Sequence, residues 1–259
     1  MGWETGPLIL LLNAANRDAF PALMDDMFRI RHEVFVDLKG WEELRRPDGR
    51  ETDPWDRADA AYLLAVDGER VLGGARFNGG GGPTLAGEIL PELFADAPPI
   101  GEDFLEMSRL FARSHAALKD LLSPVISELL VAAAELQRIV GGRGALTIME
   151  LKLAQAMLAW GGHPEPLGLP QRTRDGVLVG VMAHATALAS RNLRRARGQT
   201  GPAIWWADAP GAAPRLYADV LRVDPVGSDW IPPPGLTPLE RAHLRPEELA
   251  EAYWKTRMR

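Results

Sequence analysis

The sequence contains no cysteine among its 259 residues, which excludes disulfide bonds, thiolate metal sites and a cysteine nucleophile. It also lacks any run of the ~20 apolar residues that a membrane helix requires. The apolar stretch at 7–12 is short and follows Glu4 without a basic residue, so it does not have the pattern of a signal peptide. We therefore predict a first β-strand at 7–12 and a cytoplasmic protein without a membrane span.

The motifs of several common chemistries are missing as well. There is no phosphate-binding loop, no dinucleotide-binding G-x-G-x-x-G and no G-x-S-x-G nucleophile turn. The five histidines show no pair at metal-ligand spacing, so we predict no metal site. The net charge of −6 argues against nucleic acid as a partner. With 46% hydrophobic and 25% charged residues, the composition is that of a globular protein.

The hydrophobic pattern up to residue 187 predicts strands and helices in alternation. Apolar residues at three- and four-residue steps indicate helices, and short apolar or alternating runs indicate strands. The predicted helices span 14–36, 88–94, 118–140 and 151–160. The predicted strands span 7–12, 61–66, 70–77, 103–111, 145–149 and 177–184. Antiparallel neighbours followed by strand–helix units indicate an α+β fold, in which helices flank one mixed β-sheet.

The composition changes beyond residue 198, where tryptophans lie among many prolines: Trp205, Trp206, Trp230 and Trp254. Four tryptophans in a free tail would leave a large apolar area in water. We therefore predict a domain over 1–197 and a C-terminal extension over 198–259 that packs on it. Within the extension, a helix is expected over 237–254, beginning at a capping box of Thr237 and Glu240.

Three arginines and three carboxylates stand out because they come from separate predicted elements and balance in charge. They are Arg31, Asp53, Asp56, Arg76, Glu106 and Arg109. The two aspartates lie in a long polar loop at 41–59, and a loop of that kind inside a compact domain is usually functional. Two interpretations are open: the six residues converge as a charge-balanced site for a zwitterionic ligand, or they are solvated surface charges.

Phe35, Trp41 and Trp55 lie near these charges in the sequence. The face of an aromatic ring attracts a cation such as a sulfonium or ammonium group. The rings therefore either bind a cationic ligand or pack between the first helix and the sheet, and both interpretations stay open.

The order of these residues resembles that of the acyl-homoserine-lactone synthases, the autoinducer synthases of bacterial quorum sensing. The similar positions are Arg31-x-x-x-Phe35, Trp41, Glu51-x-Asp53-x-x-Asp56, Gly73-x-x-Arg76 and Glu106-x-x-Arg109. The resemblance covers about residues 7–187 and implies the fold of the GCN5-related N-acetyltransferases (GNAT fold), which is consistent with the α+β pattern. Trp55 departs from the family, which usually has Phe there, and the extension from 198 has no counterpart.

The resemblance also implies a reaction. The substrates would be S-adenosylmethionine and an acyl thioester on acyl-carrier protein or coenzyme A, and no prosthetic group would take part. The amine of S-adenosylmethionine would be acylated, and its carboxylate would then close a lactone and release methylthioadenosine. Glu106 would accept the amine proton, while Arg109 would orient Glu106 and lower its pKa unless burial offsets that effect.

The other candidate residues would bind the substrates. The aromatic ones would surround the sulfonium and adenosyl groups: Phe35, Trp41 and Trp55. The charged ones would order the loop that covers these groups: Arg31, Asp53, Asp56 and Arg76. The acyl chain would enter an apolar pocket between the sheet and the helix at 118–140, lined by Thr147 and Met149.

Two alternatives remain. One is a GNAT-type N-acyltransferase that uses acyl-CoA and another amine, although its pyrophosphate motif has only an imperfect match at 138–143, at a predicted helix C-terminus. The other is a non-catalytic relative that binds a partner through the extension. The sequence leaves open the acyl chain, the oligomeric state and the carrier, for which the basic stretch at 191–197 is a candidate docking patch.

Overall fold

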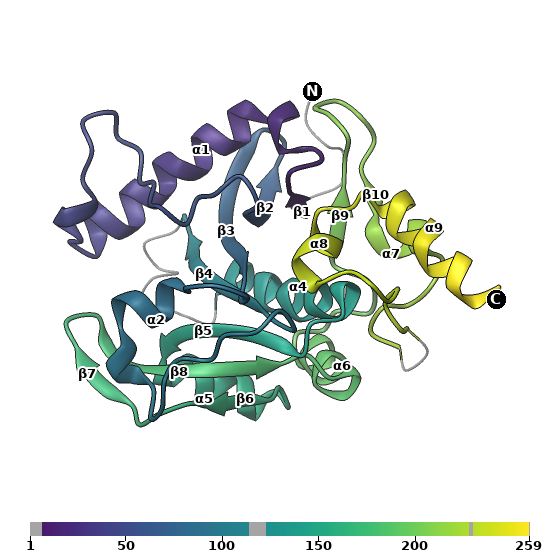
Figure 1. Ribbon diagram of the computed structural model, residues 1–259. Coiled ribbons are helices and arrows are strands. Elements are labelled where there is room, and N and C mark those ends of the chain that lie inside the picture. The colour runs from purple at the N-terminus through teal and green to yellow at the C-terminus, as the bar shows by residue number, and fades with distance from the viewer. Residues whose placement is uncertain (1–6, 114–122, 228–229, 259) are drawn as a thin grey trace.

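A single mixed β-sheet runs through the molecule (Figure 1). The computed structural model describes residues 7–113, 123–227 and 230–258. Within these ranges its strands are β1 (Leu8–Leu12), β2 (Ala61–Asp67), β3 (Arg70–Gly79), β4 (Leu105–Ala112), β5 (Gly144–Glu150), β6 (Pro164–Pro166), β7 (Gln171–Thr173), β8 (Gly176–His184), β9 (Ile204–Trp206) and β10 (Arg215–Leu216). Their order is β10-β9-β1-β2-β3-β4-β5-β8-β6, with β7 paired to β8. The pairs β1–β9 and β4–β5 are parallel, and the other pairs are antiparallel.

Helices cover both faces of this sheet. The α-helices are α1 (Pro21–Arg31), α2 (Leu85–Ile89), α4 (Pro124–Val140), α5 (Leu151–Ala159), α6 (Ala187–Ala196), α7 (Tyr217–Leu221), α8 (Pro238–Ala242) and α9 (Pro246–Arg257). Shorter or irregular helical segments are η1 (Arg17–Ala19), η3 (Glu42–Leu44), η4 (Pro91–Leu93) and the π-helix η2 (His32–Leu38). None of the described helices is long and apolar enough to cross a bilayer.

Alternation of side chains along the strands divides the core into two layers. On β2, Leu63 packs in the cluster that includes α4, and Leu64 packs in the cluster that includes α1. Figure 1 shows α1 on one face of the sheet and α4 on the other. The fold is therefore α+β with a mixed sheet between helical layers, as the hydrophobic pattern predicted.

The long central helix α4 is delimited by its own sequence. The side chain of Ser123 accepts a hydrogen bond from the amide of Ile126, and Pro124 occupies the first helical position. Gly141 ends the helix in a left-handed conformation with φ 71°. The helix predicted over 118–140 is thus confirmed from 124 onward, while 118–122 lie outside the described residues.

The sheet opens in its middle, between β4 and β5. These two strands pair only at Leu105–Ala145 and Glu106–Leu146, and beyond these pairs they diverge (Figure 1). A β-bulge adds to the divergence, because Arg109 and Leu110 of β4 both stand opposite the single Ala75 of β3. The opening leaves room for a ligand site between the two halves of the sheet.

Three predicted helices have different bounds in the structure. The helix predicted over 88–94 is the end of α2, which stops at Ile89, followed by η4 from Pro91. The helix predicted over 14–36 begins only at Pro21 and continues from His32 as the π-helix η2, which ends at Leu38. The helix predicted over 237–254 is two helices, because Pro246 cannot donate a backbone hydrogen bond and instead starts α9. The capping box of Thr237 and Glu240 is present at the start of α8.

The strands that the sequence did not predict are the shortest ones: β6, β7, β9 and β10. Each has three residues or fewer, which is too short for a period-two pattern to stand out. Among them, β9 belongs to the C-terminal extension and pairs in parallel with β1. The extension therefore completes one side of the sheet, while a domain boundary at 197/198 stays a prediction.

A buried carboxylate of α4, Glu135, holds both α6 and the extension. Glu135, which is fully buried, accepts hydrogen bonds from Arg194 at 2.6 Å and from the backbone amide of Ala203 at 2.8 Å. Burial raises the pKa of Glu135, against the charge of Arg194 and the backbone hydrogen bonds. Just beyond this contact, the fully buried Trp206 side chain enters the same core cluster as α4.

Because Trp206 lies in the core, Trp206→Ala should lower the free energy of unfolding by about 3–5 kcal/mol. Trp254→Ala, which truncates a tryptophan of the same extension that is 37% exposed, serves as the matched control and should cost less than about 2 kcal/mol. Urea denaturation measures both. Equal and small losses would mean that the extension is not part of the core in solution.

Candidate active site

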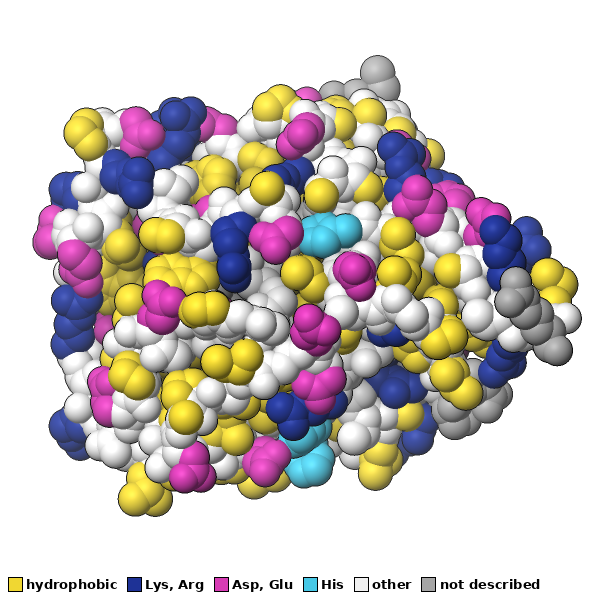
Figure 2. Space-filling model, viewed as in Figure 1, with side chains coloured by type: hydrophobic (Ala, Val, Ile, Leu, Met, Phe, Trp, Pro, Cys, Tyr) yellow, Lys and Arg dark blue, Asp and Glu magenta, His cyan; other side chains and the backbone are white. Residues whose placement is uncertain are grey.

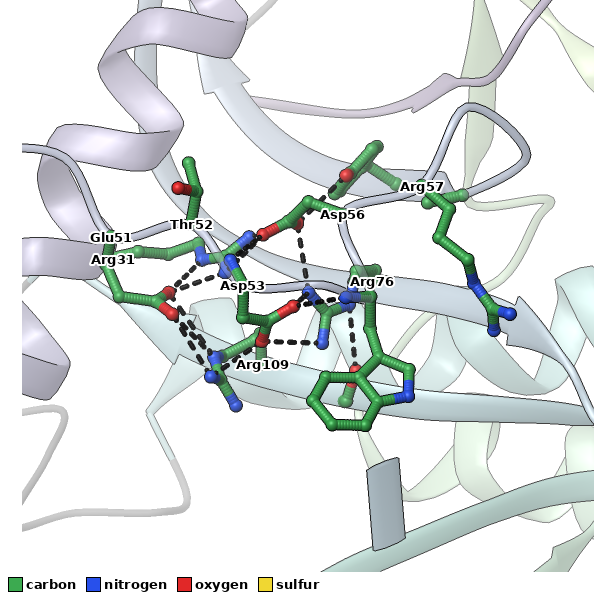
Figure 3. Close-up of polar contacts among 12 residues, drawn as sticks. Arg31, Glu51, Thr52, Asp53, Asp56, Arg57, Arg76 and Arg109 are labelled. Carbon is green, nitrogen blue, oxygen red and sulfur yellow. Dashed lines mark hydrogen bonds and ion pairs between the residues drawn. The ribbon is translucent and has the colours of Figure 1, made fainter. Parts of the chain in front are cut away.

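Six side chains form a closed network of ion pairs between α1, the polar loop, β3 and β4 (Figure 3). They are Arg31, Glu51, Asp53, Asp56, Arg76 and Arg109. None of the six side chains is more than 9% exposed, and their charges sum to zero. We call this set the ion network.

Arg31, the last residue of α1, holds one end of the ion network. Its Nε donates to Glu51 Oε2 at 2.5 Å, and its two terminal nitrogens donate to the two oxygens of Asp56 at 2.7 and 2.9 Å. Such a two-point contact fixes orientation as well as distance. The loop at 51–56 is therefore fastened to the end of α1 through both of its ends.

The other two arginines fasten the same loop to the sheet. Arg76 of β3 donates to both oxygens of Asp53, at 2.6 and 3.1 Å, and lies 3.0 Å from Asp56. Arg109 of β4 lies 3.1 Å from Glu51 and 2.7 Å from Asp53. Each carboxylate thus contacts two arginines, which is the balance that buried charges require.

The ion network shifts the pKa of Asp56. Burial alone would raise the pKa of this carboxyl, but the positive charges of Arg31 and Arg76 outweigh burial and hold it well below the ordinary value. The hydroxyl of Tyr62 donates to Asp56 at 3.0 Å, and burial together with that negative charge raises the pKa of Tyr62. Asp56 is accordingly a permanent anion at neutral pH.

Glu106 stands outside the ion network. The sequence-based expectation that Arg109 orients Glu106 is wrong. Arg109 contacts Glu51 and Asp53, so it does not orient Glu106. The left-handed backbone of Arg109 (φ 52°) at the bulge directs its side chain to the loop. Glu106 is oriented instead by backbone amides at the start of α2, from Leu85 at 3.0 Å and Ala86 at 2.7 Å.

The different surroundings give Glu106 the opposite pKa shift. Burial raises its pKa, and it outweighs the two amide hydrogen bonds and the more distant charge of Arg76. A buried carboxyl with a raised pKa accepts a proton more readily than an exposed one, which suits a group that exchanges protons with a ligand. In the ion network, Glu51 takes the place that the sequence suggested for Glu106.

A cavity of about 460 Å³ lies in the opening between β4 and β5. Most of the predicted site residues line it: Phe35, Trp41, Asp53, Trp55, Glu106, Arg109, Thr147 and Met149. The other three, Arg31, Asp56 and Arg76, support the lining from behind, through their contacts with Glu51 and Asp53. Figure 2 shows hydrophobic side chains at the surface between α1 and α2, with acidic and basic side chains around them.

One wall of the cavity is aromatic. The rings of Phe35 and Trp41 stack with centroids 5.1 Å apart and an angle of 21° between their planes. The guanidinium carbon of Arg109 lies 5.4 Å from the Phe35 ring and 5.6 Å from the Trp41 ring. Phe35 is also part of the core beside α1, so the core-packing interpretation holds for this ring, while the binding of a cationic ligand stays a prediction.

Another part of the cavity lining is apolar. Thr147 and Met149 of β5, which are 4% and 6% exposed, line it together with Leu110, Leu153 and Leu178. α2 contributes further side chains of this kind to the lining. An apolar chain would fit here between β4 and β5. The sequence-based expectation of a pocket between the sheet and the helix at 118–140 is wrong, since no described residue of α4 lines the cavity.

Sequence reasoning missed two parts of the site. Glu51 was visible two residues before Asp53, but nothing in its spacing showed that it would lie between two arginines. Arg174 and Asp175, which lie between β7 and β8, also line the cavity. No signal in the sequence could have placed that turn beside Trp41.

The two basic motifs discussed for the sequence lie away from the cavity. Residues 138–143 are at the C-terminal end of α4, which presents carbonyl groups and not amides to a ligand. In the stretch at 191–197, Arg194 is buried against Glu135. Of the described residues that line the cavity, none belongs to α6, and the described part of the chain holds no cluster of three or more potential metal ligands.

The fold and the site define the class of protein: an α+β acyltransferase fold with a charged and aromatic cavity at an opening in its sheet. The family described as autoinducer synthase matches residues 17–179. The chain therefore belongs to the autoinducer synthase family, whose members are acyltransferases that make acyl-homoserine lactones.

Individual relatives agree. The isovaleryl-homoserine lactone synthase of Bradyrhizobium diazoefficiens is 43% identical over 88 residues, which are 34% of this chain and 40% of that protein. The acyl-homoserine-lactone synthase of Acinetobacter nosocomialis is 33% identical over 56% of this chain and 82% of its own length. The chain thus spans less than half of the first relative and most of the second.

Solved structures show the same likeness. The CoA-dependent acyl-homoserine lactone synthase BjaI, solved with SAM and isopentyl-CoA, superposes with a TM-score of 0.70 at 29% identity, over 80% of this chain and 96% of BjaI. MesI, another CoA-dependent acyl-homoserine lactone synthase, superposes with a TM-score of 0.68 at 27% identity, over 76% of this chain and 98% of MesI.

Breaking the ion network should strongly destabilise the protein. Asp56→Asn takes one of the two counter-charges from both Arg31 and Arg76 and leaves the buried network with a net positive charge, so it should lower the free energy of unfolding by about 3–5 kcal/mol at pH 7. Asp25→Asn removes a partly exposed partner of two arginines and should cost much less, because exposed ion pairs add little to stability. Urea unfolding of the two variants measures the contrast, and equal losses would contradict it.

The loss of stability in Asp56→Asn should depend on pH. Because the pKa of Asp56 is lower in the folded than in the unfolded protein, its stabilisation is complete at neutral pH and is lost on acidification. The difference in the free energy of unfolding between the unmodified protein and Asp56→Asn should be constant down to about pH 5 and shrink below about pH 4. A difference that grows towards low pH would contradict a lowered pKa.

Proposed function

We propose that the protein is an acyl-homoserine-lactone synthase that joins the acyl group of an acyl-CoA to S-adenosylmethionine and closes the product to a lactone. The observation that carries the proposal is Glu106, a buried carboxylate in the cavity that lies outside the ion network and has a raised pKa. Family membership and the SAM and isopentyl-CoA of the BjaI structure support the choice of substrates.

In the first step, the α-amine of S-adenosylmethionine attacks the thioester carbonyl. The protonated amine is not a nucleophile, so it gives a proton to Glu106, directly or through water. The C–N bond forms, the C–S bond of the thioester breaks, and the thiol leaves with a proton. Because β4 no longer pairs with β5 beyond Glu106, its backbone amides on that side are available to stabilise the oxyanion.

In the second step, the carboxylate of the acylated substrate attacks the methylene carbon next to its own sulfonium. The new C–O bond closes the lactone, and the C–S bond breaks to release neutral methylthioadenosine. No proton is transferred in this displacement. The enzyme contributes mainly by holding the chain in a folded conformation, so that the reacting atoms are close.

The remaining residues bind and orient the substrate. The stacked rings of Phe35 and Trp41, with Trp55, face the sulfonium and adenosyl groups. The ion network keeps the loop at 51–56 in place, and this loop carries Asp53 and Trp55 into the cavity. The apolar end with Thr147 and Met149 accepts the acyl chain.

Two findings favour coenzyme A over acyl-carrier protein as the donor. BjaI and MesI, which superpose on most of this chain, are both CoA-dependent. The basic stretch at 191–197 is the candidate patch for an acidic carrier protein. Its Arg194 is paired with the buried Glu135, and none of the described residues that line the cavity belongs to this stretch. Both substrates are cytoplasmic metabolites, so we place the reaction in the cytoplasm.

Glu106→Gln tests the proposed base. The amide cannot accept a proton, so the rate of amine acylation should fall by about 10²- to 10⁴-fold while S-adenosylmethionine still binds. Glu88→Gln, which alters an exposed carboxylate of α2, is the control and should retain the rate. Mass spectrometry of the acylated product gives the rate, and calorimetric titration gives the binding. A rate in Glu106→Gln equal to that of the control would exclude Glu106 as the base.

The acylation rate should also depend on pH. Because only the ionised form of Glu106 accepts a proton, the rate should decline on acidification through its raised pKa, above the ordinary carboxyl range. This acidic limb should be absent from the residual activity of Glu106→Gln. An unmodified enzyme whose rate is flat down to the ordinary carboxyl range would contradict the raised pKa.

The choice of donor is tested with matched acyl groups on coenzyme A and on acyl-carrier protein. With S-adenosylmethionine present, acyl-CoA should give a kcat/KM for methylthioadenosine release at least about tenfold higher, a difference of ~1.4 kcal/mol in transition-state stabilisation. A preference for the carrier protein would overturn the donor assignment alone. If neither donor leads to release of methylthioadenosine, whatever its acyl group, the proposed function is overturned.

A further inference from the structure

A contact between distant segments crosses the mouth of the cavity. The indole nitrogen of Trp41, in the segment between η2 and η3, donates to Asp175 Oδ1 at 2.7 Å. Asp175 lies in the turn between β7 and β8, which Figure 1 shows on the same side of the molecule as the chain that follows α1. Both residues line the cavity.

The turn that carries Asp175 is fixed by its own hydrogen bonds. The amide of Asp175 donates to Thr173 Oγ1 at 3.1 Å, and that hydroxyl donates to the carbonyl of Gly176 at 3.2 Å. Gly176 has a φ of 114°, which side-chain-bearing residues rarely adopt. The Asp175 side chain is only 17% exposed, so its hydrogen bond to Trp41 is largely shielded from water.

Trp41 needs such a partner because the chain around it is not part of the core. It follows Gly40, which has a left-handed φ of 72°, and its own backbone amide bonds to the carbonyl of Phe35 at 2.9 Å. These contacts fix the backbone, while the indole plane is set by the Phe35 stack on one side and by Asp175 at its edge. The Asp175 hydrogen bond thus selects one orientation of the ring.

A second link joins the same two segments. Arg174, next to Asp175, forms an ion pair with Glu43, and both side chains are more than half exposed. Exposed ion pairs contribute little to the stability of a protein. The buried hydrogen bond of Asp175 is therefore the contact that matters for the geometry of the aromatic wall.

We propose that Asp175 is a positioning residue for S-adenosylmethionine: its carboxylate holds the Trp41 indole parallel to Phe35, so that both rings face the sulfonium. This inference rests on the proposed function. Asp175 acts through Trp41, whereas Glu106 is held by the amides of α2. Its loss therefore weakens the binding of S-adenosylmethionine without removing the base for acylation.

The experiment compares Asp175→Ala with Asp175→Asn. Alanine removes the acceptor, so the KM and the calorimetric Kd for S-adenosylmethionine should rise by about tenfold, while kcat and the KM for acyl-CoA change less than about threefold. Asparagine keeps an Oδ1 that can accept from the indole, so this variant should restore most of the affinity. Restored affinity in Asp175→Asn would show that the hydrogen bond, and not the negative charge of Asp175, supports binding.

Glu42→Gln is the matched control, because it removes an exposed ion pair to Arg45 within the same segment and leaves the contact with β7–β8 intact. It should bind S-adenosylmethionine like the unmodified protein. Unchanged affinity in Asp175→Ala, an equal loss in Glu42→Gln, or equal losses for both substrates would overturn the role of Asp175. An unmodified protein that does not bind S-adenosylmethionine would instead overturn the proposed function, and this role with it.

Discussion

The site depends on the need of buried charges for partners. Three guanidinium groups and three carboxylates are nearly shielded from water, and removing any one would leave the buried network with an unbalanced charge. Since the partners belong to α1, the loop at 51–56, β3 and β4, these four elements cannot shift independently. The loop, which makes few apolar contacts of its own, thereby becomes a fixed wall of the cavity.

The same physical principle explains why two buried carboxylates have opposite properties. Asp56 contacts two arginines, whose charges lower its pKa in spite of burial. Glu106 receives only amide hydrogen bonds, and burial raises its pKa. A carboxylate that has been neutralised by ion pairs is a structural anion, whereas one that is solvated by amides alone can accept a proton. The separation of Arg109 from Glu106 is thus what lets burial raise the pKa of Glu106.

The cavity itself results from incomplete strand pairing. β4 and β5 share only two residue pairs, and the bulge at Arg109 turns β4 further away. This opening brings a polar, aromatic end and an apolar end into one space, which suits a charged substrate that has to meet an acyl chain. The far edge of the sheet is completed by β9 of the extension, so a segment without a motif still contributes to the core.

The sequence by itself determined the α+β class, the main helices and strands, and eight of the residues that line the cavity, because periodicity and motif order are local properties of the chain. It could not determine the partners of those residues. That Glu51 and not Glu106 would join Arg31 and Arg109, or that Asp175 would meet Trp41, depends on contacts between segments far apart in the chain. Tertiary structure decided these pairs, since a left-handed backbone at one bulge residue and a turn between two short strands direct side chains in ways that no local pattern records.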